Sequence, residues 1–221
     1  MDRSAEGNVV SLGESGPGFA TMGVYQTQGQ FSGFTSRIYY VFDLTSVSGP
    51  ISSATLRLEL DRYFVGAATT NFTIYDFTGN PDDLSLTYSQ GSAAGLAIYN
   101  DLGSGAVFGS GVADASQFSY ACSPTCSGTL GAPGAIASFT LNQAALNAIN
   151  ANLGGKFAIG LRLDDESETN LYTDFKAVTF HYLYSTTPRV AELVLDPVPE
   201  PSTCTLITFG FAAALLFRRP R

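Results

Sequence analysis

The sequence predicts an all-β fold, namely a jelly-roll-like antiparallel β-sandwich with one short helix and a C-terminal hydrophobic helix. Three observations lead to this prediction. Most of the chain between residues 22 and 196 consists of short runs of alternating apolar and polar residues, turn-forming residues separate these runs, and one segment has helical spacing. Many short strands joined by turns favour a sandwich over an α/β fold, in which helices would alternate with strands.

The length and composition bound the domain organisation and the partners. We expect a loosely ordered, Gly- and Ser-rich N-terminal segment at 1–20, one β-sandwich domain at 21–196 and a C-terminal signal at 197–221. The net charge of −8 argues against a nucleic-acid partner, which requires a basic patch. A low charged fraction of 14% with many Tyr and Phe residues is typical of extracellular β-domains.

The first strands alternate clearly. "SRIYYVFDL" and "ATLRLELDRY" have period two, the pattern of half-buried antiparallel strands, and Gly49-Pro50 between them indicates a turn. The side chains expected to face the core are Ile38, Tyr40, Phe42, Leu44, Leu56, Leu58 and Leu60. The side chains expected to face outward are Arg37, Asp43, Arg57, Glu59 and Asp61.

Further strands are expected along the rest of the chain, with one helix among them. The strands are predicted at 72–77, 84–88, 106–112, 136–141, 157–163, 178–184 and 191–195. The segment 142–153 has helical spacing, with Asn142 as the N-cap and Gly154-Gly155 as the stop. We expect this helix to pack across an open end of the sandwich.

Two of the three cysteines lie close together in a loop. Cys122 and Cys126 stand in "CSPTC", while Cys204 lies alone at the start of the apolar tail. One histidine and two thiolates fall short of the four ligands of a structural zinc site. The pair could form a short disulfide in an oxidising compartment or remain two free thiols, and the sequence leaves both alternatives open.

Catalytic chemistry has little support, and we predict that the protein is not an enzyme. A Ser-His-Asp triad would have to use His181, the only histidine, which the alternation of "TFHYLY" places on a strand surface. The acidic residues Asp164, Asp165, Glu166 and Asp174 could hold a structural Ca²⁺, although an acidic solvated loop is the commoner arrangement. Sugar stacking would have to use tyrosines, and those in or near loops are Tyr63, Tyr99, Tyr120 and Tyr172.

The C-terminal tail combines prolines, an apolar run and a basic cluster. Pro197, Pro199 and Pro201 favour an extended, accessible chain. The segment 202–217 has roughly 16 residues, or about 24 Å of helix, which is a short span for a hydrocarbon core of about 30 Å. The positive-inside rule would keep Arg218, Arg219 and Arg221 in the cytoplasm and place the β-domain outside.

Two stretches of the β-domain resemble known families. "YYVFDLTSVSGPISSATLRLEL" looks like the opening strands of DNRLRE-type domains, which are secreted β-sandwich modules, some of them carbohydrate-binding. "SFTLNQAALNAINANLGGKFAIGLRL" is similar to a segment common in PEP-CTERM surface proteins. These are hydrophobic-pattern motifs, so they speak for a fold more than for a function.

The tail resembles the PEP-CTERM sorting signal that exosortase reads. In that resemblance Pro199, Glu200 and Pro201, followed by Ser202, form the recognition motif, 203–217 is a transient membrane helix, and the arginines are the cytoplasmic stop. The resemblance implies exosortase as a partner and delivery to the envelope or matrix of a Gram-negative bacterium that makes exopolysaccharide. "MDRSAEGNVV" lacks the features of a signal peptide, so we expect the true start of the coding sequence to lie upstream.

The resemblance gives two expectations for function. The first is an exported structural or adhesive component of an exopolysaccharide layer or biofilm. The alternative is a carbohydrate-binding module that recognises a specific glycan.

Overall fold

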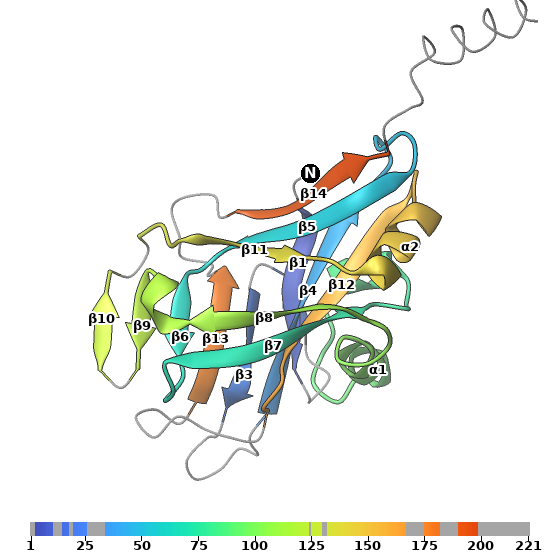
Figure 1. Ribbon diagram of the computed structural model, residues 1–221. Coiled ribbons are helices and arrows are strands. Elements are labelled where there is room, and N and C mark those ends of the chain that lie inside the picture. Colours follow the sequence, from blue (N-terminus) through green and yellow to red (C-terminus); the bar gives the residue numbers. More distant parts are fainter. Residues whose placement is uncertain are drawn as a thin grey trace, which may run out of the picture.

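The computed structural model describes residues 3–10, 15–17, 20–25, 34–123, 125–129, 132–166, 175–181 and 190–198. Within these residues strands predominate and form two sheets, a small one lying across a larger, curled one (Figure 1). The small sheet consists of β11 (Ile136–Thr140), β5 (Ile51–Glu59) and β14 (Ala191–Pro197). The larger sheet consists of β1 (Arg3–Val10), β2 (Ser15–Pro17), β3 (Ala20–Tyr25), β4 (Phe34–Asp43), β6 (Arg62–Phe64), β7 (Thr69–Asp76), β8 (Val107–Asp114), β9 (Tyr120–Cys122), β10 (Cys126–Gly128), β12 (Lys156–Leu163) and β13 (Phe175–His181).

The order of strands in the larger sheet is β10-β9-β6-β13-β3-β4-β12-β7-β8, and β1 pairs with both β2 and β4. The pairs are antiparallel except for β6 and β9, which are parallel. The all-β class is therefore confirmed, with this one exception to antiparallel pairing.

The main core lies between the two sheets. Alternate residues of β4 and β5 point into it, including Ile38, Tyr40 and Leu58, all of them fully buried. The inward faces predicted for these strands are confirmed. The 3.3–3.4 Å rise and alternating side chains of a strand make every second residue available to the core, which is why period two identified these faces.

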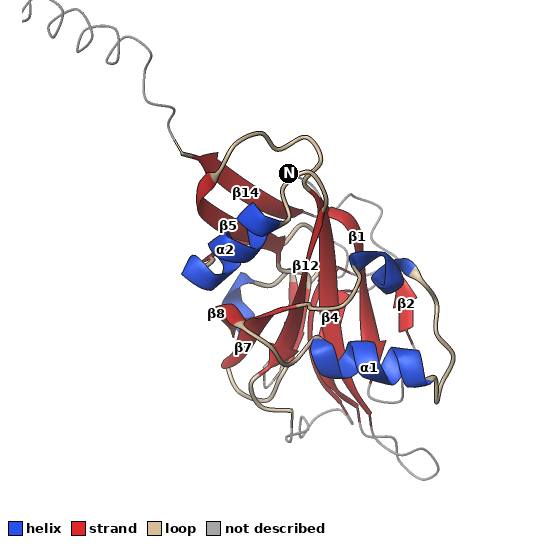
Figure 2. Ribbon diagram, turned by 90° about the vertical axis from the view of Figure 1, so that its right-hand side faces the viewer, coloured by secondary structure: helices blue, strands red, loops and turns tan. Residues whose placement is uncertain are grey.

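Part of the outer face of the larger sheet, around β4, is also buried, which the sequence did not predict. Tyr39 and Val41, on the other face of β4, pack in a second apolar cluster with Leu84 and Leu102. A helix, α1 (Ala93–Asp101), and a 3₁₀ helix, η1 (Pro81–Ser85), cover this face (Figure 2). The described residues thus form three layers: the small sheet, the large sheet and this helical cover.

Two predictions fail at this cover. The expected strand at 84–88 is wrong, because Asn80 caps a 3₁₀ turn and Pro81 stands at its start. The expectation of one short helix is also wrong, because Ser92 caps α1, its hydroxyl accepting a hydrogen bond from the amide of Gly95. Helix α1 is short and carries no clear apolar stripe, so its sequence gives a weak helical signal.

The N-terminal segment also differs from expectation. Residues 3–10 form β1, which pairs with β4 over a register that includes Gly7 opposite Tyr39. Val9 is buried in the second apolar cluster. The sequence did not reveal this strand because the segment is rich in Gly and Ser and shows no clear apolar alternation.

The predicted helix at 142–153 is confirmed as α2 (Gln143–Ala151). The side chain of Asn142 caps it, accepting from the amide of Ala145 at 3.1 Å. The same side chain donates to the carbonyl of Val107 at 2.7 Å, which fixes the helix start to the edge strand β8. Ala145, Leu146 and Ile149 form the buried face.

Two acidic side chains at the end of β5 are buried rather than exposed. Glu59 and Asp61 were expected to face solvent, but they are 5% and 1% exposed. The Glu59 carboxylate accepts from the amides of Gly134 at 3.1 Å and Val190 at 3.2 Å. Local alternation could not show that these distant segments cover the strand end, so the outward prediction fails here.

Candidate sorting signal and its exit from the β-domain

Strand β14 leads directly into the C-terminal signal. It pairs with β5, with Ala191 opposite Leu58 and Leu193 opposite Leu56; these two inward side chains are buried, and the third, Leu195, is partly buried against the core. On the outer face the Arg57 guanidinium donates to the Glu192 carboxylate at 2.6 Å. The strand is therefore an integral part of the small sheet.

Hydrogen bonds hold the chain in place to the last residue before the signal motif. The amide of Val198 donates to the carbonyl of Pro50 at 2.8 Å. The Ser52 hydroxyl lies 3.0 Å from the Asp196 carbonyl and 3.3 Å from the Pro197 carbonyl, and the Ser53 hydroxyl donates to the Asp196 carboxylate. These hydrogen bonds attach the chain to the small sheet as far as Val198, immediately before Pro199.

The turn between β4 and β5 supports this exit. Residues 44–53 carry no charged side chain. The Asp43 carboxylate accepts hydrogen bonds from the Thr45 side chain and amide, which lower the pKa of Asp43. Gly49 has φ of 79°, a left-handed conformation that side chains disfavour. The turn is therefore defined locally by capping and by glycine.

An apolar groove of about 240 Å³ opens beside the exit. Its lining residues are Val47, Ser48, Ile51, Leu193, Leu195 and Pro197. Asn150 of α2 fixes one wall, because its side chain accepts from the Ile51 amide at 2.7 Å and donates to the Ile51 carbonyl at 3.0 Å. These two bonds connect the backbone of one lining residue to α2.

The residues of the predicted sorting motif lie outside the described part of the chain. These are Pro199, Glu200, Pro201 and Ser202, together with Arg218, Arg219 and Arg221. The predicted membrane helix at 203–217 lies outside it as well. In the part that is described, we find no helix with the length and apolar character needed to cross a membrane.

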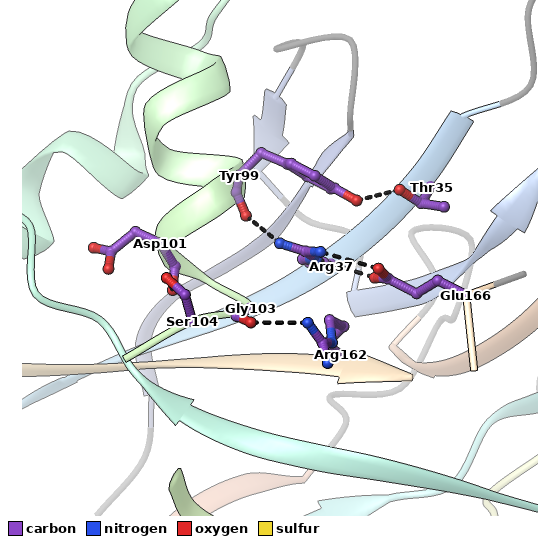
Figure 3. A network of polar contacts seen from close by, with 8 residues as sticks. All are labelled: Thr35, Arg37, Tyr99, Asp101, Gly103, Ser104, Arg162 and Glu166. Atoms are coloured by element: carbon purple, nitrogen blue, oxygen red, sulfur yellow. Dashed lines mark hydrogen bonds and ion pairs between the residues drawn. The ribbon is translucent and has the colours of Figure 1, made fainter. Parts of the chain in front are cut away.

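A network of charged residues lies at the other end of β4 (Figure 3). Arg37 donates from Nε to one Glu166 oxygen at 3.0 Å and from Nη2 to the other at 2.9 Å, while Nη1 donates to the Tyr99 carbonyl at 2.9 Å. Its guanidinium also stacks on the Tyr99 ring, 4.1 Å from the centroid. Burial raises the pKa of Tyr99, whose hydroxyl is hydrogen-bonded to Thr35.

The network fixes the C-terminal end of α1 to the sheet. Arg162 of β12 donates to the carbonyl of Gly103 at 3.0 Å. A Cβ on Gly103 would lie 2.4 Å from Nη1 of Arg37, so a larger residue here would require the guanidinium to shift. Because Arg37 of β4 and Arg162 of β12 both donate to carbonyls at the end of α1, the arrangement acts as a structural clamp. Sequence reasoning missed it because Arg37 was expected to face solvent.

The candidate calcium ligands are engaged differently from one another. Glu166 is paired with Arg37, and Asp164 accepts from the Thr73 hydroxyl at 2.6 Å. Asp174 lies outside the described residues. Among the residues described, no group of three or more His, Cys, Asp or Glu side chains is placed to hold a metal ion. The calcium site stays a prediction.

The remaining candidate residues are placed as follows. Cys122 and Cys126 are joined by a disulfide between β9 and β10. His181 is the last residue of β13, with Ala20 opposite it in β3.

The loop tyrosines offer no exposed platform where they are described. Tyr63 is fully buried and donates to the Ala67 carbonyl at 2.8 Å, and Tyr99 is buried in the network. Tyr120 is partly buried against the Phe64 ring, with centroids 5.8 Å apart. Tyr172 lies outside the described residues.

The comparisons with known proteins concern the tail. Residues 197–221 match the family described as the PEP-CTERM protein-sorting motif. No curated protein matches the chain. The match begins at Pro197, the last residue of β14, so the signal and the β-domain adjoin without a linker. It supports an exported protein that exosortase processes.

Proposed function

We propose that the protein is an exosortase substrate whose β-domain serves a structural or adhesive role in an exopolysaccharide layer. One observation carries the first part of this proposal: a sorting-signal match at 197–221 begins at the last residue of β14. The role in the layer, and its setting at the surface of a Gram-negative bacterium, rest on the resemblance of the tail and extend the proposal.

The proposed mechanism assigns a role to each part of the signal. Pro199 and Pro201 fix two φ angles and keep Glu200 on an extended chain, where a membrane enzyme can read one charge and a defined backbone. The apolar segment 203–217 anchors the precursor in the inner membrane. The arginines that follow hold its end in the cytoplasm.

The geometry of β14 restricts where cleavage can occur without damage. Leu193 and Ala191 lie opposite Leu56 and Leu58 of the buried core. A cut inside β14 would expose this apolar surface to water and destabilise the domain. A cut after Val198 leaves the small sheet whole, so we propose that processing takes place on the C-terminal side of this residue.

Substitution in the motif tests the proposal. The full chain is expressed behind an export signal peptide in a host with exosortase, and its mass and membrane fraction are followed. We expect Glu200→Ala and Pro201→Ala to leave the precursor uncut in the inner membrane. The matched control is Glu192→Ala, an acid in β14 that is paired with Arg57 and lies outside the motif. If both motif variants mature like the wild type, the proposal is wrong.

A glycan array distinguishes the structural role from the alternative of a carbohydrate-binding module. One strong, calcium-sensitive hit would favour the module, whereas no binding would favour a matrix component. The burial of Tyr63 and Tyr99 removes two of the four candidate sugar platforms, and this favours the structural role. The jelly-roll-like connectivity and the likeness to DNRLRE-type domains stay predictions, and no catalytic activity is proposed.

A further inference from the structure

We propose that the apolar groove beside the exit is a docking site for the extracytoplasmic surface of exosortase. The inference rests on the proposed function and adds a second contact to it. The enzyme would then bind the substrate at two places, the motif in the tail and the folded end of the domain. The groove is defined by the six lining residues given above.

The motif is separated from the groove by only a few residues of the chain. Glu200 follows Pro197, a lining residue of the groove, by three positions. Because an extended chain spans at most about 3.6 Å per residue, Glu200 lies within about 11 Å of Pro197. This separation is smaller than the radius of gyration of even a 100-residue enzyme domain, which is about 13 Å. An enzyme that encloses the motif is therefore expected to contact this end of the β-domain.

Hydrogen bonds also restrain the chain at residues 196–198, where it leaves the small sheet. The Val198 amide donates a hydrogen bond to the Pro50 carbonyl, and the Ser52 hydroxyl donates to the carbonyls of Asp196 and Pro197. The domain therefore has little freedom to swing away from an enzyme that holds the motif. A rigid surface loses little conformational entropy on binding, which favours a productive contact.

The groove is lined mainly by apolar side chains. The turn at 44–53 is uncharged within a chain of net charge −8. Val198 is 44% exposed beside the groove, and the fully buried Leu193 forms part of its lining. The six lining residues carry no charge, although the exposed Asp196 stands between two of them, Leu195 and Pro197. An uncharged, apolar lining suits a partner that presents an apolar side chain or loop. We therefore assign the groove an apolar element of the enzyme.

The test blocks the groove without touching the motif. Ser48 is exposed at the mouth of the groove, so Ser48→Trp adds bulk and Ser48→Glu adds charge with little effect on folding. The matched control is Ser127→Trp, an exposed serine on β10, which is far from β14 in Figure 1. The rate of precursor processing in exosortase-positive cells is measured for each full-length variant, with its unfolding midpoint as a check.

We expect both Ser48 variants to slow processing by at least about five-fold, as loss of a contact that matters at an interface would. Ser127→Trp should be processed at the wild-type rate. A ten-residue Gly/Ser insertion between Val198 and Pro199, with an average span of about 17 Å, should also slow processing. In the inserted chain Ser48→Trp should have no further effect, because the groove and the motif are no longer held together.

Three results would overturn the docking site. The first is wild-type processing of both Ser48 variants while Glu200→Ala stays uncut, which refutes the groove and leaves the proposed function intact. The second is faster processing after the insertion, which would make the domain an obstacle. The third is a Ser48 variant that changes membrane association of the precursor but not its cleavage, which would assign the groove to lipid. Normal processing of Glu200→Ala would instead refute the proposed function itself.

Discussion

The two ends of β4 are stabilised by different chemistry. At its beginning, Arg37 is buried, stacks on Tyr99 and forms a two-pronged ion pair with Glu166. At its end, the turn at 44–50 is held by backbone hydrogen bonds, among them the Leu44 amide to the Gly155 carbonyl at 2.8 Å, and by the exposed Asp43 carboxylate, which accepts from the Thr45 amide. The first end clamps a helix to the sheet, and the second leaves an apolar groove open beside the sorting signal.

The two ends of β4 therefore differ in role: one stabilises the fold, and the other presents a surface. A buried ion pair is highly sensitive to the loss of one partner, because the other charge is left without compensation. A backbone hydrogen bond contributes only about 1 kcal/mol, and the one carboxylate that caps the turn, Asp43, is exposed, so the turn buries no charge. The charged end therefore suits a permanent contact, whereas the exit end can be rigid and still offer an apolar surface.

The largest expected effect comes from breaking the core that joins both ends. Leu58 is fully buried between the sheets, so Leu58→Asp places an unpaired charge there. We expect a loss of more than about 4 kcal/mol, enough to unfold the domain. Circular dichroism and urea unfolding measure it. Leu86→Asp, at a side chain 51% exposed, is the control and should change stability little; a soluble Leu58→Asp with an unchanged midpoint would refute the core assignment.

Two Arg–Glu ion pairs that differ in burial test directly how much burial contributes to the loss of stability. Removing Glu166 by Glu166→Ala leaves the mostly buried Arg37 without its partner, and we expect a loss of about 3 kcal/mol. The same change at Glu192, whose partner Arg57 is 38% exposed, should cost about 0.2–1 kcal/mol. Urea unfolding of both variants makes the measurement. Equal losses would mean that burial does not distinguish the two pairs.

At the exit end, the two hydrogen bonds of Asn150 provide a smaller test. Asn150→Ala removes both bonds to Ile51 and leaves its amide and carbonyl without these partners, so we expect a loss of about 2 kcal/mol. Asn147→Ala, at an exposed position of the same helix, should lose less than about 0.5 kcal/mol. If the two variants unfold at the same urea concentration, α2 does not frame the groove.

The smallest effect is a pH dependence that has opposite signs at two aspartates. Burial, together with the charge of Asp101, raises the pKa of Asp76 above its ordinary value of 3.8, so ionisation of Asp76 opposes folding. Asp76→Asn should therefore stabilise the protein at pH 7, and the gain should fade as the pH falls to about 3.8.

Asp43 is the matched control at the exit end. Hydrogen bonds from Thr45 lower the pKa of Asp43, so its ionised form favours folding above pH 3.8, and this contribution is lost as the pH falls through the lowered pKa. Asp43→Asn should therefore destabilise the protein at pH 7. Thermal unfolding at several pH values tests both variants, and the same sign at both positions would contradict the assignment.

The sequence predicted the parts of the fold that depend on local pattern. The inward faces of β4 and β5 follow from period two, and the cap of α2 at Asn142 follows from residue chemistry and spacing. It failed where burial comes from distant segments. Arg37, Glu59 and Asp61 read as outward residues, but segments distant in the chain contact them. These contacts are Tyr99 and Glu166 at Arg37, the amides of Gly134 and Val190 at Glu59, and Ser119 at Asp61.

At the candidate site too, the features that depend on local sequence were predicted, and those that depend on distant segments were not. The tail could be read from its own residues, because prolines, an apolar run and arginines stand in a short order that needs no tertiary contact. The groove could not be read, since Val47 of the turn and Leu195 of β14 lie far apart in the chain and meet only through pairing of β5 with β14. A sequence signal for it exists only in hindsight, in the uncharged run at 44–53.

The most direct test of the account is the intact mass of the mature protein from exosortase-positive and exosortase-deficient cells. The account predicts that exosortase removes Arg218, Arg219 and Arg221 with the apolar segment and leaves a chain that ends at or after Val198. Without exosortase the precursor should keep its full C-terminus in the membrane. A mature chain that ends inside β14, or the same full-length mass in both hosts, would contradict the account.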